Sequence, residues 1–138
     1  HVAGVKEAGG SCDRVARIRR EFGPEYAILS GDDSLTLPFL SLGAHGVVSV
    51  ASNLVPKAVV EMVESFQTGN MGVALRLERE LHDLFDALFL EPNPVPVKHA
   101  LARAGIIASS EVRLPLCEMS TDSRARLDEV LDQLPLRD

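Results

Sequence analysis

Apolar positions in the first half of the chain form two kinds of pattern, short β-like runs and stretches with helical spacing. The β-like runs span residues 2–5, 26–30 and 46–50. The third run is rich in β-branched residues, which favour strands. Helical spacing predicts helices over 12–22 and 34–42, and Ser11 is the expected N-cap of the first. Three β-runs separated by helices indicate parallel strands joined by crossover helices.

The second half of the chain has helical spacing only. A predicted long helix over 70–90 carries an apolar stripe, made by Leu77, Leu81, Leu84, Phe85, Leu88 and Phe89. Pro56 suits the first turn of the helix before it, and Gly69 suits the end of that helix. We therefore divide the chain into a β/α part, residues 1–68, and a helical part, residues 69–138.

Two shorter helices follow in the predicted helical part. The first is expected over 98–104, because the three prolines within 91–98 prevent regular helix throughout that segment. The last begins after Ser120 or Thr121 as N-cap. Its buried face is expected to consist of Leu127, Val130, Leu131 and Leu134.

The predicted fold class is α/β, with parallel strands that must be covered on both faces. Three β/α units allow an open three-stranded sheet, whereas a closed β/α barrel needs eight. The chain begins with His1 and runs directly into an apolar segment. We expect the chain to be the C-terminal portion of a larger fold.

Charge and composition narrow the classes of partner. The 138 residues include 14 Lys and Arg against 20 Asp and Glu, a net charge of -6. This balance argues against nucleic acid and anionic membranes as partners, because both attract positive surfaces. No apolar stretch approaches the roughly 18 residues needed to span a bilayer. Two cysteines, Cys12 and Cys117, are too few for a disulfide framework and favour a reduced, cytoplasmic setting.

Lys6 is the first candidate for chemistry, because reactive groups of β/α folds lie at the carboxyl ends of strands. An amine partly removed from water at the end of a buried strand is less readily protonated. A neutral amine can attack a carbonyl carbon and form a Schiff base. The alternative is that Lys6 only marks the point where the strand reaches solvent.

Gly31, Asp32 and Asp33 follow the second predicted strand. We expect Gly31 to allow a close approach of the backbone. The aspartates precede a helix, where N-capping and favourable interaction with the helix dipole are routine roles for acidic residues. We therefore expect them to shape a site rather than to act as acid or base.

The four histidines do not form a metal site by their spacing. His1 is terminal, and His45 precedes a strand, which places it at the face opposite the strand ends. His82 and His99 lie on predicted helices without a second ligand four residues away. Structural roles are expected for all four, with no metal and no cofactor.

Five segments together resemble a known family in their order and spacing. They are Val5–Ala8, Leu29–Asp33, Gly46–Val50 with Asn53, Glu91–Lys98 and Arg113–Leu116. Their sequence resembles the C-terminal half of the dihydrodipicolinate synthase family, which belongs to the pyruvate-dependent class I aldolases. The resemblance covers essentially the whole chain, and the run Pro92–Lys98 is more particular to the synthase branch than to its relatives.

The resemblance implies a partial (β/α)8 TIM barrel, made of the last three β/α units, followed by a C-terminal helical domain. Lys6 would be the lysine that forms a Schiff base with pyruvate. The enamine would then attack aspartate 4-semialdehyde, giving 4-hydroxy-tetrahydrodipicolinate for diaminopimelate and lysine biosynthesis. Val48 would offer its backbone carbonyl, Gly31 would line the pocket, and Asp32, Asp33 and Asn93 would support it. The full-length enzyme would be a cytoplasmic homotetramer.

The chain also departs from this family. The tyrosine proton shuttle, the threonine pair and the arginine of the family lie in its N-terminal half, and Tyr26 begins a strand at the wrong face to replace the shuttle. We expect the isolated chain to have negligible synthase activity. The alternatives are an N-acetylneuraminate lyase or a 2-keto-3-deoxy-sugar aldolase of the same superfamily, and a non-catalytic β/α interaction domain.

Overall fold

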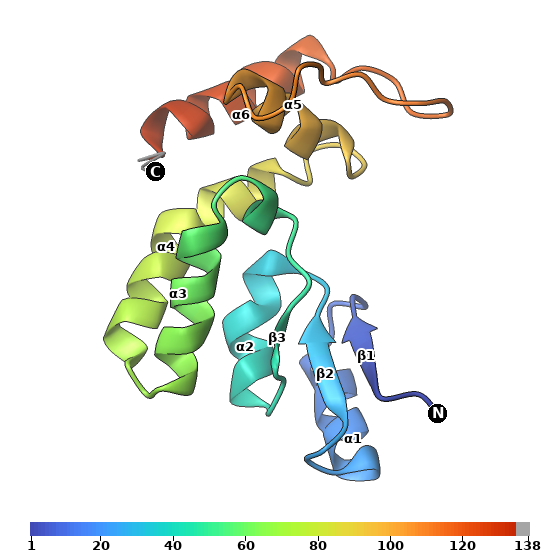
Figure 1. Ribbon diagram of the computed structural model, residues 1–138, viewed down its shortest axis with the longest axis vertical. Coiled ribbons are helices and arrows are strands. Elements are labelled where there is room, and N and C mark those ends of the chain that lie inside the picture. The colour runs from blue at the N-terminus through green and yellow to red at the C-terminus, as the bar shows by residue number, and fades with distance from the viewer. Residues whose placement is uncertain (135–138) are drawn as a thin grey trace.

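The computed structural model describes residues 1–134, and its sheet has three parallel strands. They are β1 (Gly4–Glu7), β2 (Ala27–Ser30) and β3 (Gly46–Val47), in that order across the sheet. The register pairs Lys6 with Leu29 and Leu29 with Gly46. The predicted parallel arrangement is therefore confirmed (Figure 1).

The third strand is shorter than predicted. It ends at Val47 instead of Val50, although the N–H of Val48 still donates to the carbonyl of Ser30 at 2.8 Å. A short 3-10 helix, η2 (Ala51–Asn53), begins almost at once. Apolar, β-branched residues favour a strand here, but the chain must turn toward the next helix, and this turn ends the pairing.

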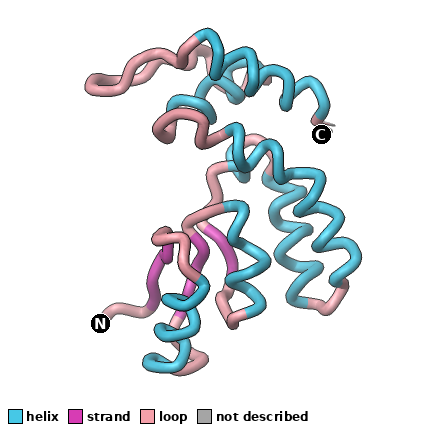
Figure 2. The backbone as a smooth tube through the Cα atoms, turned by 180° about the vertical axis from the view of Figure 1, so that it is seen from behind, coloured by secondary structure: helices cyan, strands magenta, loops and turns pink. Residues whose placement is uncertain are grey.

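Two helices, α1 (Cys12–Phe22) and α2 (Thr36–Ser41), cover one face of the sheet, as the two opposite views show (Figures 1 and 2). The side chain of Ser11 caps α1 by accepting from the N–H of Arg14 at 3.3 Å, as predicted. A 3-10 helix, η1 (Asp33–Leu35), replaces the predicted first turn of α2. Within residues 1–134 no helix covers the other face, so the described residues cover the sheet on one face only.

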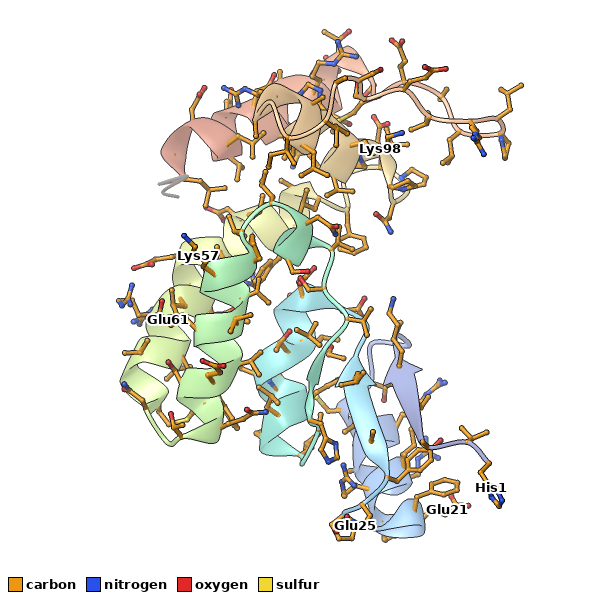
Figure 3. The ribbon with its side chains drawn as sticks, viewed as in Figure 1. His1, Glu21, Glu25, Lys57, Glu61 and Lys98 are labelled. Atoms are coloured by element: carbon orange, nitrogen blue, oxygen red, sulfur yellow. The ribbon has the colours of Figure 1, made fainter. Side chains whose placement is uncertain are left out.

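A helical hairpin packs beside α2. It consists of α3 (Pro56–Gln67) and α4 (Met71–Ala87), and Pro56 occupies the first turn of α3 as predicted. Gly69 joins the two helices with a φ of 80°, a left-handed backbone conformation that favours glycine. Figure 3 shows Lys57 and Glu61 of α3 on the outer side of this hairpin, away from the sheet.

The larger of two apolar clusters continues across the predicted division at residue 68. It joins Leu37 and Leu40 of α2 to Met62 of α3 and Leu84 of α4. The smaller cluster lies between the sheet and its helices, and its buried members are Val15, Ile28 and Phe39. The division into residues 1–68 and 69–138 stays a prediction, and the packing on its two sides is continuous.

The predicted apolar stripe of α4 is buried, with one exception. Leu77, Leu81, Leu84, Phe85 and Leu88 are buried, whereas Phe89 is 47% exposed. The helix ends at Ala87, so Phe89 no longer follows the helical spacing that the stripe assumes.

The last two helices are α5 (Val95–Arg103) and α6 (Thr121–Gln133). α5 begins three residues earlier than predicted, because a proline in the first turn, here Pro96, loses no helical hydrogen bond. Ser120 caps α6 as predicted, accepting from the N–H of Ser123 at 3.3 Å. Leu127 and Leu131 are buried, and Val130 and Leu134 pack partly buried beside them.

The carboxyl ends of the strands point toward the end of the molecule that carries α5 and α6 (Figure 1). Among residues 1–134, no helix has both the length and the apolar character that crossing a membrane requires.

Candidate active site

Lys6 lies on the face of the sheet that no described helix covers. Side chains alternate between the two faces of a strand. Val5 and Ile28 belong to the cluster under α1 and α2, so Lys6 and Leu29 project from the opposite face. Because Glu7, Ser30 and Val47 share one register row, the next residue, Val48, lies on the same face as Lys6. The side chain of Lys6 is exposed, so the expected removal from water is not met within residues 1–134.

A hollow of about 390 Å³ brings Lys6, Val48 and Asn93 together. The three come from the end of β1, the end of β3 and the loop before α5. The remaining lining residues are Ser49, Val50, Asn53, Pro94, Val97, Lys98 and Leu101. Half of the six predicted site residues therefore meet in one hollow, at the carboxyl ends of the strands.

Lys98 is a lining residue to which the sequence analysis gave no role. Figure 3 shows it on α5, in the layer of helices beyond the strand ends. Its ammonium donates to the backbone carbonyl of Glu111 and thereby ties α5 to the loop after it. The position of Lys98 at the end of the proline-rich run is the signal that could have drawn attention to it.

Gly31 is not among the residues that line the hollow. Its N–H donates to the carbonyl of Glu7 at 2.8 Å. A Cβ at position 31 would overlap the Cβ of Ala8 and would lie 3.0 Å from the Cα of Ala8. The predicted close approach of backbone is present, and it holds the ends of β1 and β2 together.

Asp33 caps a different element from the one predicted. Its side chain is buried, and its Oδ2 accepts from the N–H groups of Val50 at 2.9 Å and Ala51 at 3.2 Å. The cap therefore belongs to η2, after β3, and not to the helix that follows Asp33 itself. Asp32 makes no capping hydrogen bond either. Neither aspartate therefore takes the routine role of capping the helix that follows it.

Asp32 lies in an environment that disfavours its negative charge. Burial raises the pKa of Asp32 above its ordinary value, and the negative charge of Asp33 adds to this, whereas the positive charge of Lys6 lowers it. Asp32 and Asp33 line a second hollow of about 250 Å³ together with Phe85, Asp86 and Phe89. The two aspartates thus line this second hollow and not the Lys6 hollow.

Three of the histidines make structural contacts. The Nδ1 of His45 accepts from the N–H of Ile28 at 3.2 Å, which places it at the amino ends of the strands. His82 contacts Glu78 within α4, and His99 contacts Asp128 across α5 and α6 at 2.9 Å. Within residues 1–134, His, Cys, Asp and Glu side chains form no group of three or more that could hold a metal ion.

The family model, the similar sequences and the similar structures all point to the same protein family. The model of the dihydrodipicolinate synthetase family matches residues 1–134. The chain is 43% identical to the 4-hydroxy-tetrahydrodipicolinate synthase of Aquifex aeolicus, over 99% of its own length, and 47% identical to that of Methanothrix thermoacetophila, over 97%. The crystal structure of the Aquifex aeolicus enzyme superposes with a TM-score of 0.93 at 43% identity, covering 99% of this chain.

A second solved structure agrees. The synthase from Methylacidiphilum fumariolicum superposes with a TM-score of 0.93 at 48% identity and covers 96% of this chain. The chain spans about half the length of the relatives that it matches, 47% of the Aquifex aeolicus protein and 45% of the Methanothrix thermoacetophila protein.

Proposed function

Because the chain belongs to the dihydrodipicolinate synthetase family, we propose that it forms the C-terminal half of an enzyme that condenses pyruvate with aspartate 4-semialdehyde. The observation that carries the proposal is the meeting of Lys6 and Val48 on one face of a parallel sheet, in a hollow at the carboxyl ends of its strands. The proposed fold is the last three β/α units of a (β/α)8 barrel, followed by a helical domain. The helix-free face that bears Lys6 fits the interior of such a barrel.

The proposed reaction begins when the neutral amine of Lys6 attacks the keto carbon of pyruvate. The adduct loses water and becomes an iminium ion, and loss of a methyl proton converts the iminium into an enamine. The enamine carbon then forms a bond to the aldehyde carbon of aspartate 4-semialdehyde. The aldehyde oxygen takes up a proton and becomes a hydroxyl group, and the iminium ion is restored. Attack of the product's own amino group on the iminium carbon closes the ring and releases Lys6.

The chain's other site residues hold this amine in place. We assign Val48 to presenting its backbone carbonyl beside Lys6, and Asn93 to supporting the mouth of the hollow. Gly31 contributes through the close packing of the ends of β1 and β2. We further propose that the full-length enzyme is a cytoplasmic homotetramer, as the resemblance implies.

A chimaera tests the proposed function directly. In it, this chain replaces the matched segment of the Aquifex aeolicus synthase, and borohydride is added in the presence of pyruvate. We expect a covalent adduct on Lys6 that is absent from Lys6→Ala and from Lys6→Arg, because a guanidinium stays protonated. Lys57→Ala, on the outer side of α3, is the matched control and should form the adduct as the unmodified chimaera does.

The same assay separates the alternatives. A chimaera that forms no adduct favours a non-catalytic β/α domain and overturns the proposal. An adduct followed by turnover with sugar aldehydes, and none with aspartate 4-semialdehyde, indicates a sugar-acid aldolase instead. The isolated 138-residue chain should show negligible turnover in either assay.

A further inference from the structure

We infer that Asp33 is a positioning residue, whose buried carboxylate fixes the turn after β3 and thereby keeps the backbone of Val48 beside Lys6. The inference rests on the proposed function and adds a role for a residue that touches no substrate. Asp33 is 3% exposed, and its Oδ2 accepts from two successive backbone N–H groups, those of Val50 and Ala51. A carboxylate that accepts from backbone N–H groups makes hydrogen bonds stronger than those between neutral groups.

The turn after β3 has few other ties to the rest of the sheet. Ser52 and Asn53 hydrogen bond to Ser49 and Val50, which stabilises the turn internally without fixing its position. Toward β2, the described links are the bond from the N–H of Val48 to Ser30 and the two bonds to Asp33. Asp33 therefore accepts two of the three described hydrogen bonds that join this turn to the end of β2 and the residues just after it.

The other oxygen of Asp33 indicates that stability alone does not explain this residue. Oδ1 is buried and has no hydrogen-bond partner among the described residues. Burying an unsatisfied oxygen of a carboxylate costs free energy. Both donors converge on one oxygen, so the carboxylate is oriented by, and in turn orients, the two backbone N–H groups.

The site geometry explains why this orientation matters for the reaction. Val48, Ser49, Val50 and Asn53 all line the hollow with Lys6. A shift of the turn would move the Val48 carbonyl relative to the amine, and a misplacement of about 1 Å can slow a reaction about 100-fold. Glu61, an exposed carboxylate on the outer side of α3 and away from the sheet, serves as the comparison.

The test measures how fast pyruvate is trapped on Lys6 by borohydride, per folded molecule, in the chimaera. Asp33→Ala should lower the trapping rate by about 10- to 100-fold. Asp33→Asn keeps the shape and one acceptor oxygen, and should lower it by roughly 3- to 10-fold. Glu61→Gln, on the outer side of α3, should leave it within about 2-fold of the unmodified chimaera.

Arg19→Ala provides a control that is destabilised but intact at the site. The Arg19 guanidinium donates to the carbonyls of Gly23, Tyr26 and Gly43, at the amino ends of the strands. This variant should unfold more easily yet trap pyruvate at the unmodified rate. If Asp33 only stabilised the fold, Asp33→Ala and Arg19→Ala would trap pyruvate at equal rates per folded molecule.

The outcomes are distinct. An unmodified trapping rate in Asp33→Ala, or an equal loss in Arg19→Ala, overturns the inference while the proposed function stands. If Asp33→Ala does not fold, Asp33→Asn decides, and an unmodified rate in that variant overturns the inference. A chimaera that traps no pyruvate at all overturns the proposed function and this inference with it.

Discussion

Replacement of Gly31 by alanine tests whether the ends of β1 and β2 are packed as closely as the structure shows. A Cβ at position 31 would overlap the Cβ of Ala8 and would lie 3.0 Å from the Cα of Ala8 and 3.1 Å from the carbonyl oxygen of Glu7. Two of these three neighbours are backbone atoms, which cannot rotate away. The strand ends must therefore separate, and the 2.8 Å hydrogen bond from Gly31 to Glu7 must lengthen.

The expected cost follows from these contacts. Overpacking of this kind costs about 1–3 kcal/mol, and the strained backbone hydrogen bond places Gly31→Ala in the upper part of that range. The lower entropy of the unfolded chain returns about 0.4–1 kcal/mol. We expect a net loss of roughly 1–2 kcal/mol in the free energy of unfolding.

Three further variants make the measurement specific. Gly72 lies in α4 with no atom within 4 Å of an added Cβ, so Gly72→Ala should stabilise by about 0.5–1 kcal/mol. Ala8→Gly removes the nearest obstacle, so the double variant with Gly31→Ala should show a favourable coupling of about 1 kcal/mol. Denaturant titration of the chimaera, followed by circular dichroism, gives all four values. A Gly31→Ala variant as stable as Gly72→Ala would show that the strand ends are not closely packed.

Other parts of the fold give three more expectations. Leu84→Ala, at a fully buried position, should lower the free energy of unfolding by about 2–5 kcal/mol. Leu75→Ala, at a position that is 48% exposed, should lower it by less than about 1 kcal/mol. Equal losses in the two variants would contradict the burial of Leu84 in the larger apolar cluster. Arg19→Lys should lower the free energy of unfolding by about 1–2 kcal/mol in the same denaturant titration, because an ammonium cannot reach all the carbonyls that the guanidinium reaches. An unchanged unfolding midpoint would argue against those hydrogen bonds. The pKa of His82 is raised above 6.5, chiefly by its hydrogen bond to Glu78. Its contribution to stability is therefore present below pH 6.5 and lost as the pH rises through the folded-state pKa. Proton NMR titration should show a lower pKa of His82 in Glu78→Gln, and no change would remove Glu78 as the cause.

Local signals in the sequence were sufficient to predict most of the helices and strands. Helix α1 has the predicted bounds because its N-cap, Ser11, and its terminating glycine are both local features. Pro56 and Gly69 mark the limits of α3 for the same reason. Parallel pairing follows from the alternation of strands and helices. These features depend on neighbours within a few residues, which is the range that a sequence pattern describes.

The errors occur where distant residues determine the structure. β3 ends early because its following turn is capped by Asp33, which lies 17 residues before Val50. The same contact explains why Asp33 does not cap its own helix. The early end of β3 and the role of Asp33 therefore have no local signal in the sequence, since an aspartate after a strand can cap either the helix that follows it or a distant turn. The placement of Asn93 beside Lys6 also depends on contacts between segments far apart in the chain.

Because Lys6 is exposed, the proposed enzyme needs further residues, outside this chain, to shield its amine from water. A nucleophilic lysine needs partial removal from water, because solvation favours the protonated ammonium. Residues 1–134 leave the Lys6 side chain exposed, on the face of the sheet without helices. In the proposed barrel, the other strands would enclose that face, and the chain matches about half the length of its relatives. The chimaera should therefore trap pyruvate well above the rate of the isolated chain, at equal concentrations of Lys6. Equal rates would mean that the amine needs no enclosure, and the barrel argument for Lys6 would be lost.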